Sequence, residues 1–469
     1  MTTPAAGPTV PPPAGPPTRA VIPLSGKAVL TAVVGVVLVV AAAVTALWLT
    51  LTPGAADPAR VTVRLEVLRI GLSLGLGGGG LFALYLAWRR QRSTEIALLQ
   101  KERDQADVAR AYALQERVAA ATEADAAARR ITELFTKAVE HLGASEAPVR
   151  LGGLYALERL AQDNPGQRQT IVNVLCAYLR MPVDLPREPP DDPDADRLRR
   201  REHEVRLTAQ RVLISHLRPG EDLDHPDVVF WPDLELDLTG VELHDVDFSG
   251  CRVRALRLAG ATLLGEARFT GATFTADATF EQTTLAGDVR FDRCTFAGRA
   301  LFRGMTFTGN IDFAEARFAR GARFEGTSFG ADAGFSGAGF ARSAWFTDTT
   351  FAREAEFGEV RFGGNAEFRG AVFTGTTRFV GATFTANANF HGVAFRHDVS
   401  FREATFARNA TFRGATFDGN VGLRDATFRK DADFHAAGFA HIPRFTPDQF
   451  PAGVPQALSP PNRTDDLQG

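Results

Sequence analysis

Five cationic side chains recur in one register in the C-terminal half of the chain. They are Arg303, Arg369, His391, Arg413 and His435, and the separations between them are multiples of twenty-two positions. If the chain repeats with that period, the five side chains form one column on a surface. Such a column could bind an acidic protein or a lipid headgroup. The simpler alternative is a solvated face, because Glu325 stands in the same register and interrupts the column.

The histidines of this column do not predict a metal site. His391 and His435 are separated by two such periods, and His397 and His441 repeat that separation. Two coils of parallel strands would hold the members of each pair roughly 10 Å apart, whereas zinc ligands lie about 2 Å from the ion. Neither pair alone can chelate zinc, so we expect no metal on this surface.

No other group of residues indicates catalysis. The sequence has no HExxH motif, no P-loop, no nucleophile–base pair and no carboxylate cluster with an acid–base role. The three cysteines, Cys176, Cys251 and Cys294, form no CxxC pair and predict neither a disulfide framework nor a zinc site. We therefore predict no catalytic residue and no cofactor.

The spacing of phenylalanine determines how the surface residues must be positioned. In NAEFRGAVFTGTTRFVGATFTANANF (365–390) the Phe residues are separated by steps of five, six, five and six, which fits neither a helix nor a strand. The sum of two steps is eleven, and two series with this period start at Phe269 and Phe274. The residue two places before each Phe is usually small, as at Ala366 and Ala371, and the two side chains point the same way in an extended segment. The chain therefore repeats a short extended unit, and its coils must stack to bury their faces.

Upstream the period shortens to five residues, at Leu238, Leu243, Phe248, Val253, Leu258 and Leu263. The stretch DLTGVELHDVDFSGCRVRALRLAGATL resembles pentapeptide-repeat proteins, and the later units TFRGATF and NFHGVAF resemble the Phe-rich branch of that family. The resemblance covers residues 234–450. It implies a mainly β fold, a right-handed quadrilateral β-helix with four faces in each coil.

The eleven-residue double unit departs from the family pattern. Two such units make a twenty-two-residue coil, whereas the coil of the family usually has twenty. A flatter eleven-residue coil with two faces is the alternative. We favour four faces, because the five-residue spacing upstream matches the family and because Phe needs a wide interior. Each buried Phe contributes roughly 1.5–3 kcal/mol, so the Phe series suffices to hold the coils together.

Two apolar segments predict that the chain crosses a membrane twice. Residues 28–51 and 70–88 are each long enough to span a bilayer. Arg89, Arg90 and Arg92 follow the second segment, and this positive charge favours a cytoplasmic C-terminal side. We therefore predict a multi-pass plasma-membrane protein with a cytoplasmic repeat domain and a short extracytoplasmic loop over residues 52–69.

The second apolar segment contains GLGGGG (75–80), a formal match to the dinucleotide-binding motif GxGxxG. That chemistry requires a strand before the motif and a helix opening after it, whereas here an apolar segment runs through it. We interpret the glycines as a site of close helix packing. Gly71, Gly75 and Gly79 are spaced four residues apart, so a homodimer could form through this face.

Residues 93–217 are expected to form a cytoplasmic helical module. A long amphipathic helix is followed by two helices that are joined by NPG and resemble a HEAT- or armadillo-type hairpin. Membrane-anchored pentapeptide-repeat proteins of high-GC bacteria show a similar order of two spans, a helical module and repeats. Residues 1–27, which are rich in Pro, and residues 451–469 are expected to be disordered tails.

The charge of the chain and of its repeat region helps to choose among the remaining functional hypotheses. Net charge is −3, and the repeat region is close to balance, which is a poor imitation of duplex phosphate. The leading hypothesis is a non-enzymatic, membrane-anchored interaction scaffold that presents its cytoplasmic β-helix to protein partners. One alternative is a DNA mimic that regulates or protects DNA gyrase, as some members of the family do. Another is an enzyme with its site in the helical module.

Overall fold

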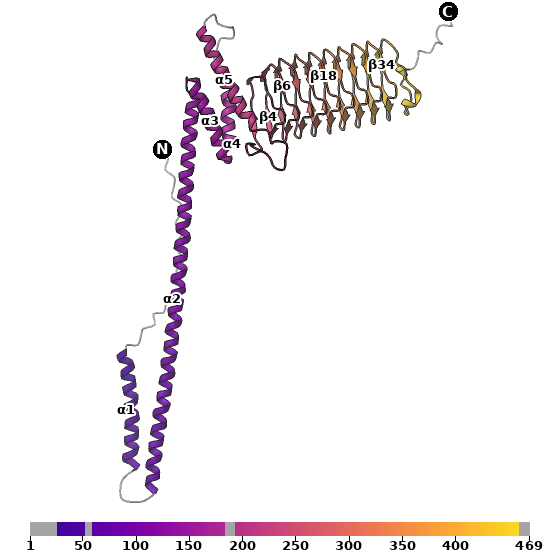
Figure 1. The fold of residues 1–469 in the computed structure, drawn as a ribbon. Coiled ribbons are helices and arrows are strands. Elements are labelled where there is room, and N and C mark those ends of the chain that lie inside the picture. The colour runs from indigo at the N-terminus through magenta and orange to yellow at the C-terminus, as the bar shows by residue number, and fades with distance from the viewer. Residues whose placement is uncertain (1–25, 52–58, 183–192, 459–469) are drawn as a thin grey trace, which may run out of the picture. The chain divides into compact units, whose positions relative to one another are not determined.

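The computed structural model describes residues 26–51, 59–182 and 193–458 (Figure 1). The chain divides into two units, residues 1–124 and residues 125–469. The first unit holds apolar helices. The second holds a helical module and a parallel β-solenoid.

Two helices are long and apolar enough to cross a membrane, judged by length and composition. α1 (Gly26–Leu51) coincides with the predicted span 28–51. α2 (Ala59–Leu142) is one continuous helix, and its apolar part begins at Leu68. All but the last two positions of the predicted tail 1–27 lie outside the described residues.

The segment between the two apolar helices is shorter than predicted. We expected a loop over residues 52–69, whereas α2 begins at Ala59, and residues 52–58 lie outside the described residues. The segment VTVRLEVLR that follows Ala59 and Arg60 contains no Gly or Pro, so nothing in it stops a helix. For the same reason RRQRS joins the predicted span 70–88 to the amphipathic helix without a break.

The helical module of the second unit contains the end of α2, α3 (Ala147–Asp163), α4 (Arg168–Arg180) and α5 (Pro193–Ser215). The predicted NPG turn forms a short 3-10 helix, η1 (Pro165–Gln167), between α3 and α4. Leu157 of α3, Leu175 of α4 and Val205 of α5 are fully buried. The three helices therefore share one core.

The repeats form a solenoid with four parallel sheets, one on each side of the coil (Figure 1). We name these sides A to D in chain order. Side A contains β1 (Glu235–Asp237), β4 (Ala255–Arg257), β8 (Ala278–Thr279), β12 (Ala300–Leu301), β16 (Ala322–Arg323), β20 (Ala344–Trp345), β24 (Ala366–Glu367), β28 (Ala388–Asn389), β32 (Ala410–Thr411) and β36 (Ala432–Asp433). Side B contains β2 (Glu242–His244), β5 (Thr262–Leu264), β9 (Thr284–Leu285), β13 (Thr306–Phe307), β17 (Ser328–Phe329), β21 (Thr350–Phe351), β25 (Val372–Phe373), β29 (Ala394–Phe395), β33 (Thr416–Phe417) and β37 (Gly438–Phe439).

The other two sides are shorter. Side C contains β6 (Ala267–Arg268), β10 (Val289–Arg290), β14 (Ile311–Asp312), β18 (Ala333–Gly334), β22 (Ala355–Glu356), β26 (Thr377–Arg378), β30 (Val399–Ser400) and β34 (Val421–Gly422). Side D contains β3 (Arg252–Val253), β7 (Thr273–Phe274), β11 (Thr295–Phe296), β15 (Arg317–Phe318), β19 (Gly339–Phe340), β23 (Arg361–Phe362), β27 (Thr383–Phe384), β31 (Thr405–Phe406) and β35 (Thr427–Phe428).

The strand register fixes the length of the coil. In the first coil Leu236 pairs with Leu256, twenty positions further along the chain. From Leu256 onward the partner stands twenty-two positions further along, as in the pair of Leu256 with Ala278. The predicted four-sided, twenty-two-residue coil is therefore confirmed, and the flatter eleven-residue coil is excluded. The five-residue spacing upstream corresponds to a twenty-residue coil at the start of the solenoid.

The Phe series forms the core of the solenoid, as predicted. Phe346 is a representative member and is fully buried. Its ring stacks on Phe324 and on Phe368, one coil away on either side, at centroid distances of 4.7 and 4.8 Å. It also meets Phe335 and Phe357 edge to face at 5.5 and 5.6 Å. Both arrangements are favourable for aromatic pairs, so each ring is held on several sides.

The helical module closes the first coil. Gln169 of α4 bonds the edge strand β1 twice, because its Nε2 donates to the Glu235 oxygen (2.8 Å) and its Oε1 accepts from the Glu235 N–H (2.9 Å). Trp231 is fully buried next to this contact. Its ring stacks on His216 at 3.8 Å, and its Nε1 donates to Gln162 Oε1 (2.8 Å). The edge of β1 is therefore covered, as the end of a repeat protein requires.

A C-terminal segment closes the last coil. Its short 3-10 helix η2 (Pro447–Gln449) places Gln449 so that Nε2 donates to the oxygens of Leu423 (2.5 Å) and Ala426 (3.0 Å). The following Phe450 stacks on Phe428 at 4.8 Å. The Ala426 oxygen, which in earlier coils would accept from the N–H of the next coil, is thereby satisfied.

Two expectations at this end are corrected. Phe445 continues the Phe series but is only half-buried, because no described strand follows β37 and the chain turns across the end of the solenoid. Residues 451–458 belong to the predicted disordered tail 451–469, yet they include η3 (Gln456–Leu458), in which Leu458 is buried. Residues 459–469 lie outside the described residues.

Candidate interaction surface of the solenoid

The predicted cationic column occupies the turns that lead from side A to side B. In one such turn the Ala371 N–H donates to the Phe368 oxygen (2.9 Å), and Gly370 has φ of 67°, which favours glycine. Arg369 is the residue between Phe368 and Gly370, and its side chain is exposed. His391, which is exposed too, has the same place in the next coil, since the Gly370 N–H donates to the His391 oxygen (3.0 Å).

The structure brings four of the five predicted residues together and separates the fifth. Arg369, His391, Arg413 and His435 are exposed and follow one another on consecutive coils. Arg303 lies in the same column, but Thr347 and Glu325 stand between it and the other four. The Arg303 guanidinium is also neutralised, because it lies 3.4 Å from Glu281 and 4.0 Å from Glu325. The described part of the chain contains no group of three His, Cys, Asp or Glu side chains that could hold a metal.

A larger concentration of charge lies on side D. It occupies the outward positions of the side-D strands and the turns from side D to side A. Seven exposed cationic residues form this basic face: Arg317, Arg320, Arg342, Arg361, Arg408, Arg429 and Lys430. From Arg317 to Asp431, Asp431 is the only carboxylate residue at these positions.

The basic face differs from the rest of the solenoid because its charges are not compensated. None of its seven residues forms an ion pair with another described residue. In the same turn of an earlier coil, by contrast, Arg299 pairs with Asp277 at 2.5 Å, and its hydrogen bonds lower the pKa of that carboxyl. Arg320 and Arg342 occupy equivalent positions on adjacent coils, roughly 4.8 Å apart along the axis. Repulsion between them opposes folding weakly, so their juxtaposition is not explained by stability.

Some carboxylates of the solenoid have a structural role on another edge. In the turns from side B to side C, side-chain oxygens accept backbone N–H groups from the next coil. Asp288 accepts from the Asn310 N–H (2.9 Å), Asp332 accepts from the Glu354 N–H (3.1 Å), and Asp398 accepts from the Asn420 N–H (2.8 Å). From Arg317 onward the carboxylates therefore lie almost entirely outside the basic face, and the near balance of the whole repeat region conceals this.

The sequence did contain the signal for the basic face. Sorting the repeat region by the register of the full coil places Arg320, Arg342 and Arg408 in one column, with Lys430 in the same column. Counting charge over the whole region averages this column with the carboxylates of the other edges. The five predicted residues form a weaker column that alternates with histidine.

The junction between α4 and the first coil contains a polar cavity of about 700 Å³. Most of its charged groups are paired: Arg180 Nη1 lies 2.8 Å from Asp237, and Arg254 pairs with Glu235. Burial raises the pKa of the adjacent Cys176 thiol to about 12, so this thiol is a poor nucleophile at neutral pH. The cavity therefore contains no activated group of the kind that catalysis needs.

The polar residues of the helical module are also engaged in packing. Both ring nitrogens of His216 have partners, Val229 O at 2.6 Å and Glu158 Oε1 at 2.8 Å. Arg206 Nη1 donates to the Leu179 oxygen at the end of α4 (2.8 Å) and pairs with Glu202. These side chains join helices to each other. They give no support to an enzyme site in the module.

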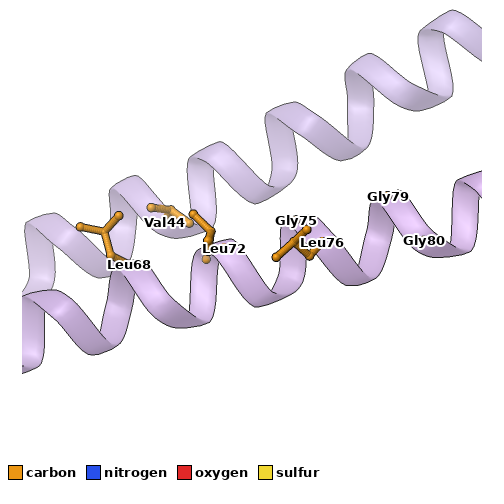
Figure 2. A pocket seen from close by; sticks show the side chains of 8 residues that line it. Val44, Leu68, Leu72, Gly75, Leu76, Gly79 and Gly80 are labelled. Atoms are coloured by element: carbon orange, nitrogen blue, oxygen red, sulfur yellow. The ribbon is translucent and has the colours of Figure 1, made fainter.

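The glycine face of α2 lines an open apolar groove beside α1 (Figure 2). Of the three predicted glycines only Gly71 approaches α1: a Cβ placed there would lie 3.0 Å from Val44 Cγ2. A Cβ at Gly75 or Gly79 would have no neighbour within 4 Å. Close packing of α1 on α2 therefore uses Gly71 and leaves the other two glycines uncovered within the described residues.

Comparison with known proteins agrees with the geometry of the solenoid. Overlapping segments from 238–295 to 390–438 match the family described as pentapeptide repeats (9 copies). No curated protein and no solved structure matches the chain. The match and the four parallel sheets together identify residues 238–438 as pentapeptide repeats folded into a parallel β-solenoid.

Proposed function

We propose that this protein is a non-enzymatic, membrane-anchored interaction scaffold, and that the basic face of its solenoid binds an acidic surface on a cytoplasmic protein partner. The observation that carries this proposal is the set of seven uncompensated cations on side D. In a chain whose net charge is −3, such a face would attract and orient an acidic partner.

The shape and composition of the basic face favour a protein over nucleic acid. It extends over six coils, which at about 4.8 Å for each coil gives a length on the order of 25 Å. Thr, Ala, Gly, Ser and Asn fill the outward positions between its cations. The ring of Trp345 on side A lies against Gly321 at the border of this face, and the Arg323 guanidinium lies over it at 4.8 Å, so this ring is already engaged. Single-stranded nucleic acid is usually held by aromatic stacking as well as by charge. A flat surface with small residues between arginines suits a protein that presents carboxylates.

The two alternatives have less support. A gyrase-directed DNA mimic needs an acidic surface that is free to act, whereas Asp288, Asp332 and Asp398 accept backbone N–H groups within the solenoid. An enzyme in the helical module needs an activated side chain, whereas His216 and Arg206 link helices. The solenoid's stacked, regular surface is better suited to binding than to catalysis.

Membrane anchoring is part of the proposal. Its support is the apolar character of α1 and of α2 from Leu68 onward, together with Arg89, Arg90 and Arg92 directly after the predicted second span. The order of two spans, helical module and repeats is also that of the Phe-rich, membrane-anchored proteins of high-GC bacteria that the sequence resembles. On this proposal the solenoid faces the cytoplasm from the plasma membrane.

We expect replacement of four basic-face residues by Gln, R320Q, R342Q, R361Q and R408Q, to weaken binding of the partner at least tenfold. The reason is that the four guanidiniums supply most of the charge that an acidic surface would meet. The measurement is quantitative cross-linking of the full-length chain in native membranes, followed by affinity measurement with the partner so identified. Binding of the wild type should also weaken as salt rises from about 0.15 to 0.5 M.

The matched control replaces two exposed arginines of the predicted column, R369Q and R413Q. It removes charge from the turns between sides A and B and leaves side D unchanged. Loss of binding in the control but not in the basic-face variant would move the site to the column of Arg369, His391, Arg413 and His435. Equal binding by all three proteins would refute an electrostatic interaction surface.

We further propose that the uncovered glycines of α2 mediate a homodimer. A second copy could approach closely at Gly75 and Gly79, where no described atom lies within 4 Å of an added Cβ. We expect G79L to reduce self-association in detergent, measured by energy transfer between labelled copies, while G35L on α1 leaves it unchanged. Equal energy transfer in the wild type and in both variants would contradict this arrangement.

A further inference from the structure

The C-terminal end of side C contains a hollow that the proposed function does not use. Side C ends at β34, while sides A and B continue to β36 and β37. The residue one coil after Val421 is Pro443, which has no backbone N–H to donate and is buried at the end of the core. The chain from His441 to Arg444 passes this unfinished edge and leaves a hollow of about 340 Å³.

The charge around this hollow is of one sign. Arg402, Arg424, His441 and Arg444 line it and are exposed, and no carboxylate residue is part of its lining. Arg402 and Arg444 form no ion pair with a described residue. Arg424 has one long contact, from its Nε to Asp425 Oδ2 at 3.4 Å, and both side chains are about two-thirds exposed.

Asp398, another carboxylate that adjoins the lining, is already engaged. Asp398 Oδ1 accepts both the backbone N–H of Asn420 (2.8 Å) and its side-chain Nδ2 (3.2 Å). Asn420 lines the hollow, so its amide stands between that carboxylate and the arginines. The hollow therefore keeps its positive potential.

The unfinished edge adds backbone donors to these cations. In the preceding coil the N–H groups of Val399 and Phe401 donate along the solenoid axis to the oxygens of Asn420 (2.9 Å) and Gly422 (2.8 Å). The equivalent N–H groups one coil later belong to Val421 and Leu423. They point the same way, toward the hollow, and have no acceptor among the described residues.

These donors lie on residues that are nearly inaccessible from other directions. Val421 is 8% exposed and Leu423 is 2% exposed, so their N–H groups require a partner at the open edge. Gly422 stands between them and has no side chain to cover that edge. An acceptor that enters the hollow would meet backbone N–H groups on one side and guanidinium groups around it.

From this geometry we propose that the hollow is a binding site for a phosphate group. A tetrahedral oxyanion can accept hydrogen bonds from several directions at once, which suits three guanidiniums and adjacent backbone N–H groups better than a planar carboxylate does. The volume is large enough for a phosphate with a substituent. The phosphate could come from a small soluble molecule or from a phospholipid headgroup, and the same chemistry would recognise both.

The test is isothermal titration of the full-length protein in a phosphate-free neutral detergent with two probes, inorganic phosphate and short-chain phosphatidic acid. The hollow variant is R424Q with R444Q. The control variant is R408Q with R429Q, which removes two exposed arginines outside the hollow. We expect the wild type and the control to bind phosphate, and the hollow variant to bind it at least tenfold more weakly.

The two probes distinguish the sources. If phosphatidic acid binds at least tenfold more tightly than inorganic phosphate, and the hollow variant loses that affinity, the result would indicate a lipid headgroup. Equal affinities of the two probes would indicate a soluble phosphate. No binding of either probe by the wild type would overturn the proposal, and so would equal weakening in the control and the hollow variant. Circular dichroism of each variant separates loss of the site from loss of the fold. Because the control substitutions fall on the basic face, failure of this proposal is distinguishable from failure of the proposed function.

Discussion

Replacement of Phe346 by Ala is expected to lower the free energy of unfolding of the solenoid by about 3–5 kcal/mol. Phe346 is fully buried between two stacked rings and three edge-to-face rings. The cavity would interrupt one Phe ladder in the middle of the solenoid. Chemical denaturation of the detergent-solubilised protein measures the effect, and amide hydrogen exchange locates it.

Replacement of Phe346 by Leu provides the matched control. Leucine occupies the same column of side A at Leu258, four coils earlier, where it is fully buried, so the coil accepts a leucine at this position. We expect this change to cost less than about 1.5 kcal/mol, because most of the volume is kept. Equal losses for Ala and Leu would show that the ring contacts, rather than the filled volume, stabilise the core. No loss for Ala would contradict a close-packed solenoid.

Replacement of Trp231 by Ala is expected to cost about 3–5 kcal/mol as well and to loosen the helical module from the first coil. Trp231 is fully buried, stacks on His216 and donates to Gln162. Loss of its ring removes the stacking partner of His216 and leaves the Gln162 oxygen without its donor. Amide hydrogen exchange should therefore become faster in α4 and in β1, at the edge that the module covers.

The conservative change of Trp231 to Phe separates the contribution of ring stacking from that of the hydrogen bond to Gln162. It keeps an aromatic surface for His216 but removes the Nε1–H donor, so we expect a cost of about 1 kcal/mol for the hydrogen bond plus the loss of volume. Exchange in strands distant from the module, such as β24, should not change. Faster exchange throughout the solenoid would contradict a local capping role, because it would mean that the module and the coils unfold as one.

The sequence predicted the solenoid because burial of the Phe side chains dominates its core. Each Phe must reach the same interior, so the spacing of Phe alone defined the coil length, the extent of the repeats and the core. The shift from five-residue to eleven-residue spacing even marked where the coil lengthens by two positions, near Leu256. A regular repeat leaves few alternatives, and the inward and outward positions follow from it.

The ends of the elements were less predictable, because each depends on contacts between residues far apart in the sequence. The start of α2 at Ala59 was missed because the apolar pattern marks a span and not the helix that contains it. The cap was missed because Gln449 lies within the range 234–450 assigned to the repeats, whereas Leu458 lies in 451–469, whose composition is typical of a tail. The pairing of Trp231 with His216 joins the helical module to the approach to the repeats, and no local pattern indicates it.

The cationic residues of the solenoid surface were identified from the sequence only in part. The column of Arg369, His391, Arg413 and His435 was chosen because its members recur at the full coil period, and they do lie together. The basic face was missed because its residues are divided between the side-D strands and the turns that follow, so no single column contains all of them. Only the assembled coil brings Arg317 beside Arg320, and both beside Arg342.

A photo-cross-linking amino acid placed on individual sides of the solenoid tests the central claim most directly. Thr383 and Thr405 lie on side D between Arg361 and Arg408, and Ala394 and Thr416 lie on side B, where the outward positions from Thr262 to Gly438 include no charged side chain. After irradiation of native membranes, we predict that the side-D positions yield adducts with one acidic protein and that the side-B positions do not. Adducts with that protein from side B, or no adduct from side D, would contradict the account.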